Sequence, residues 1–432
     1  PNPMNMQIYP RENVYHRGLG IHQHKSSNIV EDSYMIFTNH NLDDDEDGQG
    51  RLYVTNDEFR TIKDLGNTSN NNDPFFGSII LPDGTGFHQG YWGGNFRINF
   101  KELTGGTVTG AADPYAGWNH IVYDSVSGNL VACYWGSASV VWSEDKGATW
   151  KSNAAPTGGI LNWDDWDRVH DIATGSSGYS IYPHGMCCMN GIIVICGSFQ
   201  DGTTRGSVVF RSTDGGVSWT ETYRHGSGQS MLSNGGVYAD PNLGAFRWYL
   251  RYNEDGINFP GSSTGGSRGI YSSADGVTWT WQGTTTNHPS YAYGGDNGHR
   301  QYSIKDQKYY HMPQHYRNTT TFMRSTAINN DMIFESVTPN IGAWWKMTDF
   351  CMSRDGDLLL FCIRKLDTAE GDFITTDGGV ICKVCKFCVT TEQVTELQQF
   401  HIGGHDNANG ASYHYNGTHN FIKGYKNARV VF

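Results

Sequence analysis

The amino-acid sequence predicts an all-β fold, a β-propeller of seven four-stranded antiparallel blades, with six blades as the alternative. Three observations support this. Aromatic residues make up 13% of the chain, glycine occurs 54 times and charged residues are only 17%, which suits short strands and tight turns. An eight-residue turn pattern recurs, and its copies start 50 to 88 residues apart, enough for one four-stranded sheet each. We therefore expect a single propeller domain over residues 1–432.

The recurring pattern reads S-x-D-x-G-x-x-W, and full copies occur at residues 143–150 and 212–219, each after a short apolar strand. Ser and Asp side chains can bond to the nearby backbone and hold a turn, while Gly accepts the positive φ where the chain reverses. Weaker copies cover residues 55–62, 272–279, 325–334 and 375–382. Each copy predicts one hairpin per blade, with two further strands upstream of it.

The remaining elements follow from the spacing. Strands at 120–124 and 130–135, and at 347–351 and 358–362, lie upstream of two copies, and the longest interval is expected to carry an insertion at about 67–118. Residues 411–415, 419–423 and 428–432 supply three strands of a seventh blade, and residues 6–9 are expected to supply the fourth. Closure by an N-terminal strand that joins the C-terminal blade would remove the open sheet edge.

The repeats resemble the Asp-box turns of the sialidase-like β-propeller superfamily. This resemblance implies a propeller for nearly all of the chain, with the boxes structural and away from the active face. The superfamily includes sialidases, other glycosidases, polysaccharide lyases, bacteriophage tailspike enzymes and non-catalytic binding proteins, so the fold alone assigns no activity. Residues 96–99, Phe-Arg-Ile-Asn, are similar to the F/Y-R-I-P motif of sialidases apart from the missing proline. The resemblance implies that Arg97 binds a sugar carboxylate.

Bulk properties exclude several classes of function. The net charge is −12 and no basic run is present, so nucleic acid is not expected as a partner. No run of 18 apolar residues occurs, and residues 1–5 do not read as a signal peptide, so membrane insertion is not expected. Most of the nine cysteines lie in apolar runs, which indicates folding in a reducing compartment.

No cofactor or metal is expected. The acidic run 43–47 is typical of a solvated loop, with a cation site as the minor interpretation. Cys382, Cys385 and Cys388 are three residues apart, and on a strand this spacing places successive side chains on opposite faces, which disfavours a zinc site.

The starts of the innermost strands form the first candidate site, because they surround the central channel. Histidine is frequent there and can act as an acid or base near neutral pH, although a single histidine at a strand start can also be a bonded structural residue. With Tyr or Arg beside it, such a histidine could act as the base that removes the proton next to a uronate carboxylate. The predicted catalytic residues are His120, Tyr182, His184, Arg300 and Asp349. The predicted substrate-binding residues at these starts are His22, His299, His405 and Asp406. Hydrolysis by two carboxylates, drawn from Asp165, Asp167, Asp349 and Asp406, is the alternative chemistry.

Tryptophan supplies a second candidate surface, because indole rings can stack on the apolar faces of sugars. Trp163 and Trp166 are surrounded by aspartates in a long connection, which favours exposure, and Trp92 is a further candidate. Packing between blades is the structural alternative for each ring.

These observations lead to one functional hypothesis. The chain is expected to recognise a cell-surface polysaccharide, and as an enzyme to depolymerise it, in the manner of a bacteriophage tailspike or tail-fibre module. A virion tail or extracellular location follows, with a homotrimer if the chain belongs to a virion. The alternatives are a secreted polysaccharide lyase or sialidase-like glycoside hydrolase, and a non-catalytic structural propeller or adhesin.

Overall fold

The computed structural model describes sixteen segments of the chain, which carry all the strands discussed below. These segments are residues 31–40, 49–69, 78–89, 95–108, 118–134, 140–152, 180–201, 204–226, 234–250, 269–286, 300–312, 320–365, 374–375, 380–402, 413–414 and 421–424.

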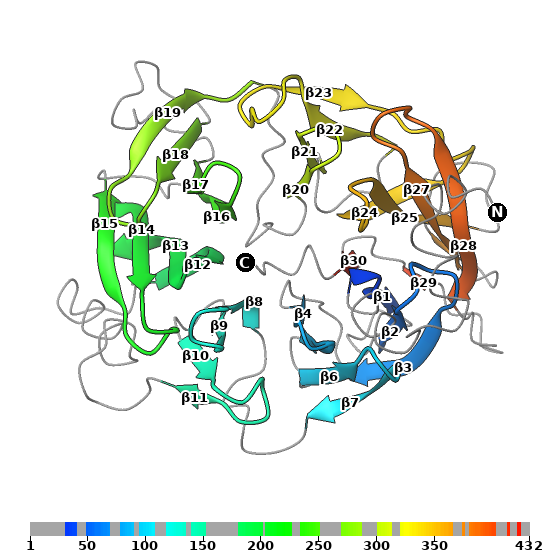
Figure 1. Ribbon diagram of the computed structural model, residues 1–432, viewed down its shortest axis with the longest axis horizontal. Coiled ribbons are helices and arrows are strands. Elements are labelled where there is room, and N and C mark those ends of the chain that lie inside the picture. The colour runs from blue at the N-terminus through cyan, green and yellow to red at the C-terminus, as the bar shows by residue number, and fades with distance from the viewer. Residues whose placement is uncertain are drawn as a thin grey trace, which may run out of the picture.

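Seven four-stranded antiparallel sheets stand around a common centre, so the protein is a seven-bladed β-propeller (Figure 1). We number the blades along the chain and give the strands of each from the innermost outward. Blade 1 consists of β30 (Phe421–Gly424), β1 (Tyr34–His40), β2 (Gln49–Thr55) and β3 (Lys63–Ser69). Blade 2 consists of β4 (Ile79–Ile80), β5 (Thr85–Gln89), β6 (Asn95–Asn99) and β7 (Thr104–Val108). Blade 3 consists of β8 (Trp118–Tyr123), β9 (Leu130–Tyr134), β10 (Val140–Ser143) and β11 (Lys151–Ser152).

The other blades repeat this order. Blade 4 consists of β12 (Ser180–Met189), β13 (Ile192–Asp201), β14 (Thr204–Ser212) and β15 (Thr220–Gly226). Blade 5 consists of β16 (Asn234–Asp240), β17 (Ala245–Leu250), β18 (Gly269–Ser273) and β19 (Thr280–Thr284). Blade 6 consists of β20 (Arg300–Ser303), β21 (Lys308–His311), β22 (Phe322–Ser325) and β23 (Phe334–Val337). Blade 7 consists of β24 (Lys346–Met352), β25 (Leu358–Lys365), β27 (Val380–Phe387) and β28 (Val394–Ile402), and a separate two-stranded sheet joins β26 (Ile374–Thr375) to β29 (Tyr413–His414).

The ring closes in blade 1, where strands from both ends of the described chain pair. β30 pairs antiparallel with β1, from Phe421 opposite Phe37 to Gly424 opposite Tyr34. Closure through one shared blade is therefore as predicted, but its division differs, since one C-terminal strand joins three N-terminal strands. The proposed strands at 6–9 and 428–432 lie outside the described residues.

The expected insertion at about 67–118 is wrong, because most of the described residues in this range form blade 2. β5 pairs with β4 and β6, and β6 pairs with β7. The sequence pattern missed this blade because its outer turn has no Ser-x-Asp pair. Instead Asn99 Oδ1 accepts hydrogen bonds from the backbone N–H groups of Lys101, at 3.0 Å, and Glu102, at 3.4 Å.

The Asp-box turns connect the third strand of a blade to the outermost one. In blade 3, Ser143 Oγ donates to Asp145 at 2.8 Å, and Asp145 accepts from the backbone N–H and the hydroxyl of Thr149 at 2.8 and 2.6 Å. Blade 4 repeats these contacts with Ser212 and Asp214.

Two expected boxes need correction. In blade 5 the serine of the box is Ser273, which donates to Asp275, rather than Ser272. The copy at 375–382 is not an outer hairpin, because Thr375 lies in β26, and the outer turn of blade 7 spans residues 388–393.

The core lies between neighbouring blades. Buried apolar clusters join blades 1, 2 and 3, blades 3 and 4, blades 4 and 5, blades 6 and 7, and blades 7 and 1. Among the residues that the structure describes, none of these clusters joins blades 5 and 6, and polar side chains fill that boundary instead.

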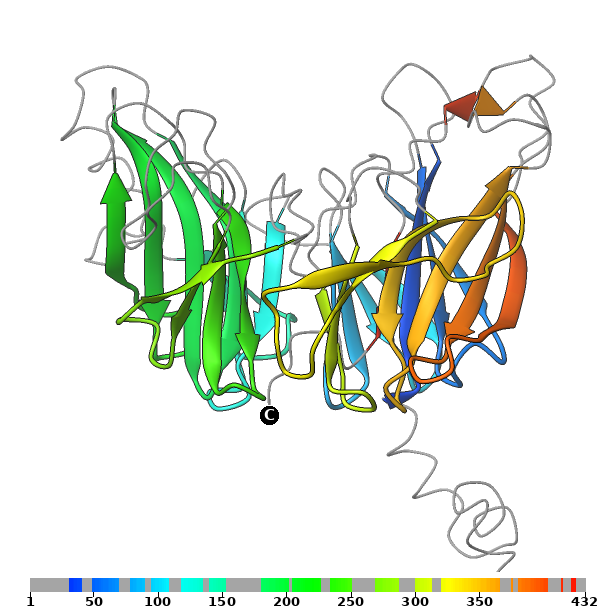
Figure 2. The same ribbon diagram turned by 90° about the horizontal axis from the view of Figure 1, so that it is seen from above.

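The two faces of the ring differ. The short turns between the first and second strands, and between the third and outermost strands, lie at the lower face in Figure 2, which we call the turn face. The innermost strands begin at the opposite face, which we call the strand-start face.

Candidate functional site

Four of the seven innermost strands carry a β-bulge near the strand-start face. The register with the second strand shifts between Trp118 and His120 in β8, between Pro183 and Gly185 in β12, between Asn234 and Val237 in β16, and between Met347 and Asp349 in β24. His120, Val237 and Asp349 each follow the bulge and lie three residues before the end of their strand. The structure therefore places three predicted residues, His120, His184 and Asp349, at or beside equivalent bulges.

The side chains that follow two of these bulges are buried. His120 and Asp349 are both fully buried, and Asp349 Oδ1 accepts a hydrogen bond from the backbone N–H of Phe350 at 2.8 Å. Thr348, the bulged residue of β24, donates its hydroxyl to the carbonyl of Phe361 at 3.3 Å. His120, Asp349 and Arg300 belong to three different blades, 3, 7 and 6, and Arg300 contacts Tyr238, Tyr249 and Asp331.

Arg300 starts β20 and turns towards blade 5, where it enters a buried polar network. Its guanidinium donates to Asp331 Oδ2 at 3.1 Å and to the hydroxyl of Tyr249, and its Cζ atom lies 3.5 Å from the ring centre of Tyr238. Arg247 donates to both oxygens of Asp331, at 2.6 and 3.0 Å. These partners occupy the guanidinium of Arg300, so a substrate would have to displace them to reach it.

The pKa values of two carboxyl groups in this network shift in opposite directions. Burial would raise the pKa of Asp331, but Arg300 and Arg247 outweigh it and lower the pKa below its usual value. Burial raises the pKa of Asp240, although a hydrogen bond from Tyr309 acts in the other direction. Asp331 is therefore the firmly ionised partner of the two arginines, and the network joins blades 5 and 6 by charge.

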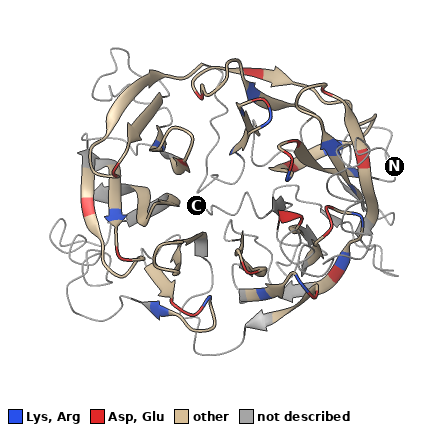
Figure 3. Cartoon of the chain, viewed as in Figure 1, with Lys and Arg blue, Asp and Glu red and all other residues tan. Residues whose placement is uncertain are grey.

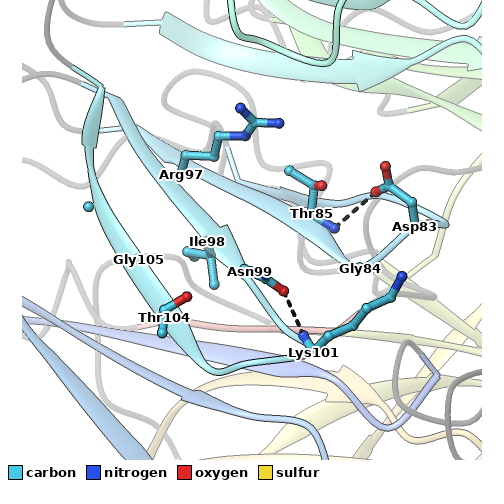
Figure 4. Close-up of a pocket in the computed structure, with 10 residues that line it drawn as sticks. Asp83, Gly84, Thr85, Arg97, Ile98, Asn99, Lys101, Thr104 and Gly105 are labelled. Carbon is cyan, nitrogen blue, oxygen red and sulfur yellow. Dashed lines mark hydrogen bonds between the residues drawn. The ribbon is translucent and has the colours of Figure 1, made fainter.

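Arg97, in contrast, lines an open hollow on blade 2. The hollow measures about 640 Å³ and is lined by Asp83, Gly84, Thr85, Arg97, Ile98, Asn99, Lys101, Thr104, Gly105 and Gly106. Arg97 lies on β6, the third strand, and is exposed. Figure 4 shows Arg97 and Asp83 on opposite sides of the hollow, and Lys101 extending from the turn after β6. Arg97 thus lies away from the innermost strands that hold the other described candidates.

One ion pair borders this hollow. Lys146, from the Asp-box turn of blade 3, lies 2.6 Å from Asp83 Oδ2. Burial alone would raise the pKa of Asp83, but hydrogen bonds from Lys146 and from the backbone N–H of Thr85 lower it overall. The hydrogen bond to Asp83 raises the pKa of Lys146. The single carboxylate of the hollow is therefore ionised and already neutralised.

Several predicted site residues are not described. His22, Trp92, Trp163, Trp166, His299, His405 and Asp406 lie outside the described residues, and for Tyr182 and His184 only the backbone in β12 is described. Their roles stay predictions. By chain order, Trp163 and Trp166 precede β12, His299 directly precedes β20, and His405 and Asp406 precede β30.

Sequence reasoning missed most of the polar network and most of the hollow. Tyr238, Arg247, Tyr249 and Asp331 were not expected, although an arginine inside the apolar run 245–250 was a usable signal for a buried charge. Lys101 and Asn99 gave no comparable signal, because exposed polar residues in turns are common.

In the part of the chain that the structure describes, no group of three or more His, Cys, Asp or Glu side chains is placed to hold a metal ion. The described residues also contain no helix with the length and apolar character needed to cross a bilayer. Basic and acidic residues of the described blades are interspersed around the ring (Figure 3).

Comparisons with known proteins found no matching family model and no matching curated protein. Similar solved structures include a putative 6-phosphogluconolactonase from Bacteroides fragilis, with a TM-score of 0.47 and 10% identity over 91% of this chain and 98% of that chain. YCF48 from Cyanidioschyzon merolae gives a TM-score of 0.41 and 10% identity over 76% of this chain and 92% of that chain. A protein from Lactobacillus plantarum gives a TM-score of 0.46 and 10% identity, over 85% and 96%. Likeness at this level assigns no activity.

Proposed function

We propose that this chain is a glycan-recognising β-propeller that binds a cell-surface polysaccharide at its strand-start face. The observation that supports the proposal is the set of four bulges in innermost strands, three of them at equivalent points. Bulges re-aim side chains and are over-represented beside active sites. Here two of them coincide with the sequence positions of Asn119 and His184, whose amide and imidazole groups suit sugar hydroxyls.

The proposed setting is a virion tail or the outside of a cell, with a homotrimer in the virion case. None of the nine cysteines, all of which lie in the described segments, forms a disulfide in the structure, and eight are buried, which fits a chain that folds in a reducing compartment before it acts outside. The mass of the purified protein in solution, measured by light scattering, separates a monomer from a trimer.

The test is a panel of bacterial surface and algal polysaccharides, with binding measured by calorimetry. We expect one glycan to bind, and Asn119→Ala or His184→Ala to weaken it roughly tenfold, the effect of about 1.4 kcal/mol. Asn242→Ala is the matched control, since Asn242 is exposed in a turn at the turn face. Thermal melting checks that each variant folds.

The same panel separates binding from cleavage. New reducing ends without ultraviolet absorbance of an unsaturated sugar would indicate hydrolysis, and both signals together would indicate a lyase. A bound glycan that stays intact would indicate an adhesin. If no glycan binds, or if Asn242→Ala weakens binding as much as the other two variants, the proposal is wrong.

A further inference from the structure

The hollow on blade 2 is a second candidate binding site, at the turn face and away from the innermost strands. It lies over the outer half of the blade, between the β4–β5 turn, which holds Asp83, and the β6–β7 hairpin, which holds Lys101. A site here is independent of the function proposed above for the strand-start face.

Positive charge gathers at this hollow although the whole chain carries a net charge of −12. Arg97 and Lys101 line it, and Lys146 borders it through its ion pair with Asp83. Among the described residues, neither Arg97 nor Lys101 forms an ion pair, and both side chains are exposed. Asp83 neutralises Lys146, so two cations remain available to an anionic ligand.

The walls of the hollow offer hydrogen-bonding groups and little bulk. Thr85, Asn99 and Thr104 contribute hydroxyl and amide groups, and Gly105 and Gly106 expose the backbone of β7. A Cβ atom at Gly105 would meet the Phe96 ring at 2.6 Å, whereas at Gly106 it would meet nothing within 4 Å. Since side chains alternate along a strand, Gly105 faces the core and Gly106 faces the hollow.

We propose that this hollow binds an acidic sugar unit, with Arg97 and Lys101 holding its carboxylate or sulfate and Thr85, Asn99 and Thr104 bonding its hydroxyls. Arg can bind a carboxylate or sulfate in a bidentate manner, which favours a planar or multi-oxygen anion. A nucleic acid fits less well, because its binding depends on many phosphate contacts, about six to ten, and the net negative charge of the chain repels a long polyanion.

The experiment measures binding of three oligosaccharides of equal length to the full chain: a uronate oligomer, a sulfated oligomer and a neutral glucose oligomer. We expect at least one acidic oligomer to bind and the neutral one not to bind. Arg97→Gln should weaken binding of the acidic oligomer roughly tenfold, because it removes about one charge-assisted hydrogen bond. Arg364→Gln is the matched control, because Arg364 is an exposed arginine on β25 of blade 7.

A shape variant supplies a second, uncharged readout. Gly106→Val fills the hollow without meeting other atoms at Cβ and adds a residue that strands favour, so it should abolish binding while the melting temperature stays within a few degrees of the parent. Asn242→Ala, in a turn outside both sites, should leave binding unchanged, whereas a loss of binding in His184→Ala without a loss in Arg97→Gln would assign the oligomer to the strand-start face and overturn this proposal.

Three outcomes would overturn the proposal. The first is equal binding of acidic and neutral oligomers. The second is an equal loss in Arg97→Gln and Arg364→Gln, which would indicate a general charge effect. The third is that a single-stranded oligonucleotide binds more tightly than either acidic oligomer when the two compete for the parent chain, and that the same variants weaken its binding. Inorganic sulfate that competes with the sulfated oligomer identifies the anion as the group that is held.

Discussion

At the scale of single residues, the Asp-box aspartates show how exposed turns stabilise the blades. In blade 3, burial would raise the pKa of Asp145, but hydrogen bonds from Thr149 and Ser143 lower it to about 2. Hydrogen bonds also lower the pKa of Asp214 in blade 4 and of Asp275 in blade 5. The folded state therefore favours the ionised form of each turn aspartate more than the unfolded chain does.

This linkage predicts a loss of stability in acid. A depressed carboxyl pKa contributes stability that is present above the unfolded pKa of 3.8 and is lost as the pH falls towards the folded value of about 2. Asp145→Asn should cost about 1 kcal/mol at neutral pH, because the carboxylate is exposed, and should flatten the fall of melting temperature between these two pH values.

Thermal melts across that range check the prediction, with Glu102→Gln, an exposed carboxylate in the outer turn of blade 2, as the control. If the melting temperature falls with pH equally steeply in the parent protein and in Asp145→Asn, the prediction is wrong.

At the scale of elements, each outer turn presses against the preceding blade. The Cβ atom of an alanine at Gly216, in the box of blade 4, would meet Val131 of blade 3 at 2.7 Å, and the residue has a φ of +86°. Gly244, in the β16–β17 turn, has a φ of +60° but meets nothing within 4 Å. Comparing the two separates backbone strain from packing between blades.

Gly216→Ala is therefore expected to destabilise the protein more than Gly244→Ala. Left-handed backbone costs an alanine about 1–2 kcal/mol at either site, and overpacking against Val131 should add about 1–3 kcal/mol at Gly216 alone. Denaturant titration of both variants measures the difference. Equal losses would mean that the turn does not press on its neighbour.

At the scale of the whole molecule, the boundary between blades 5 and 6 differs from the others because buried charges hold it. Arg247 and Asp331 lie 2.6 Å apart with side-chain exposures of 7% and 2%, and Arg300 lies 3.1 Å from the same carboxylate. A buried ion pair contributes little net stability, yet losing one partner is costly because the other charge stays buried. This boundary is therefore the one most sensitive to a single substitution.

Asp331→Asn is expected to destabilise the protein by about 3–5 kcal/mol, since it removes the anion that the two buried guanidinium groups share and leaves only Asp240, 3.9 Å from Arg300. Glu31→Gln, which removes an exposed partner of Arg354, should cost less than about 1 kcal/mol. Hydrogen exchange should show the largest loss of protection in β17 and β20. A uniform loss around the ring would contradict a local weakness at this boundary.

The sequence predicted the ring far better than its site, for a physical reason. Box contacts are local, so Ser143 and Asp145 could be recognised from an eight-residue pattern. For the same reason the pattern at 375–382 was wrongly assigned to an outer hairpin, because a local turn pattern does not show which strands flank the turn. The partners of Arg300 come from β16, β17 and the turn before β23, and only the packing of blade 5 against blade 6 brings those segments together.

The pairing of β1 with β30 has a consequence for how the protein is made. Residues 41 to 420 lie between these two strands, so no other sheet contact in the described chain spans a longer loop. During synthesis on the ribosome, β1 and its neighbours must wait, with one edge open, until residue 424 emerges. Pairings of such high sequence separation fold slowly and leave strand edges open to association with other chains. Nascent chains of this protein are thus most vulnerable to aggregation before residue 424 has emerged from the ribosome.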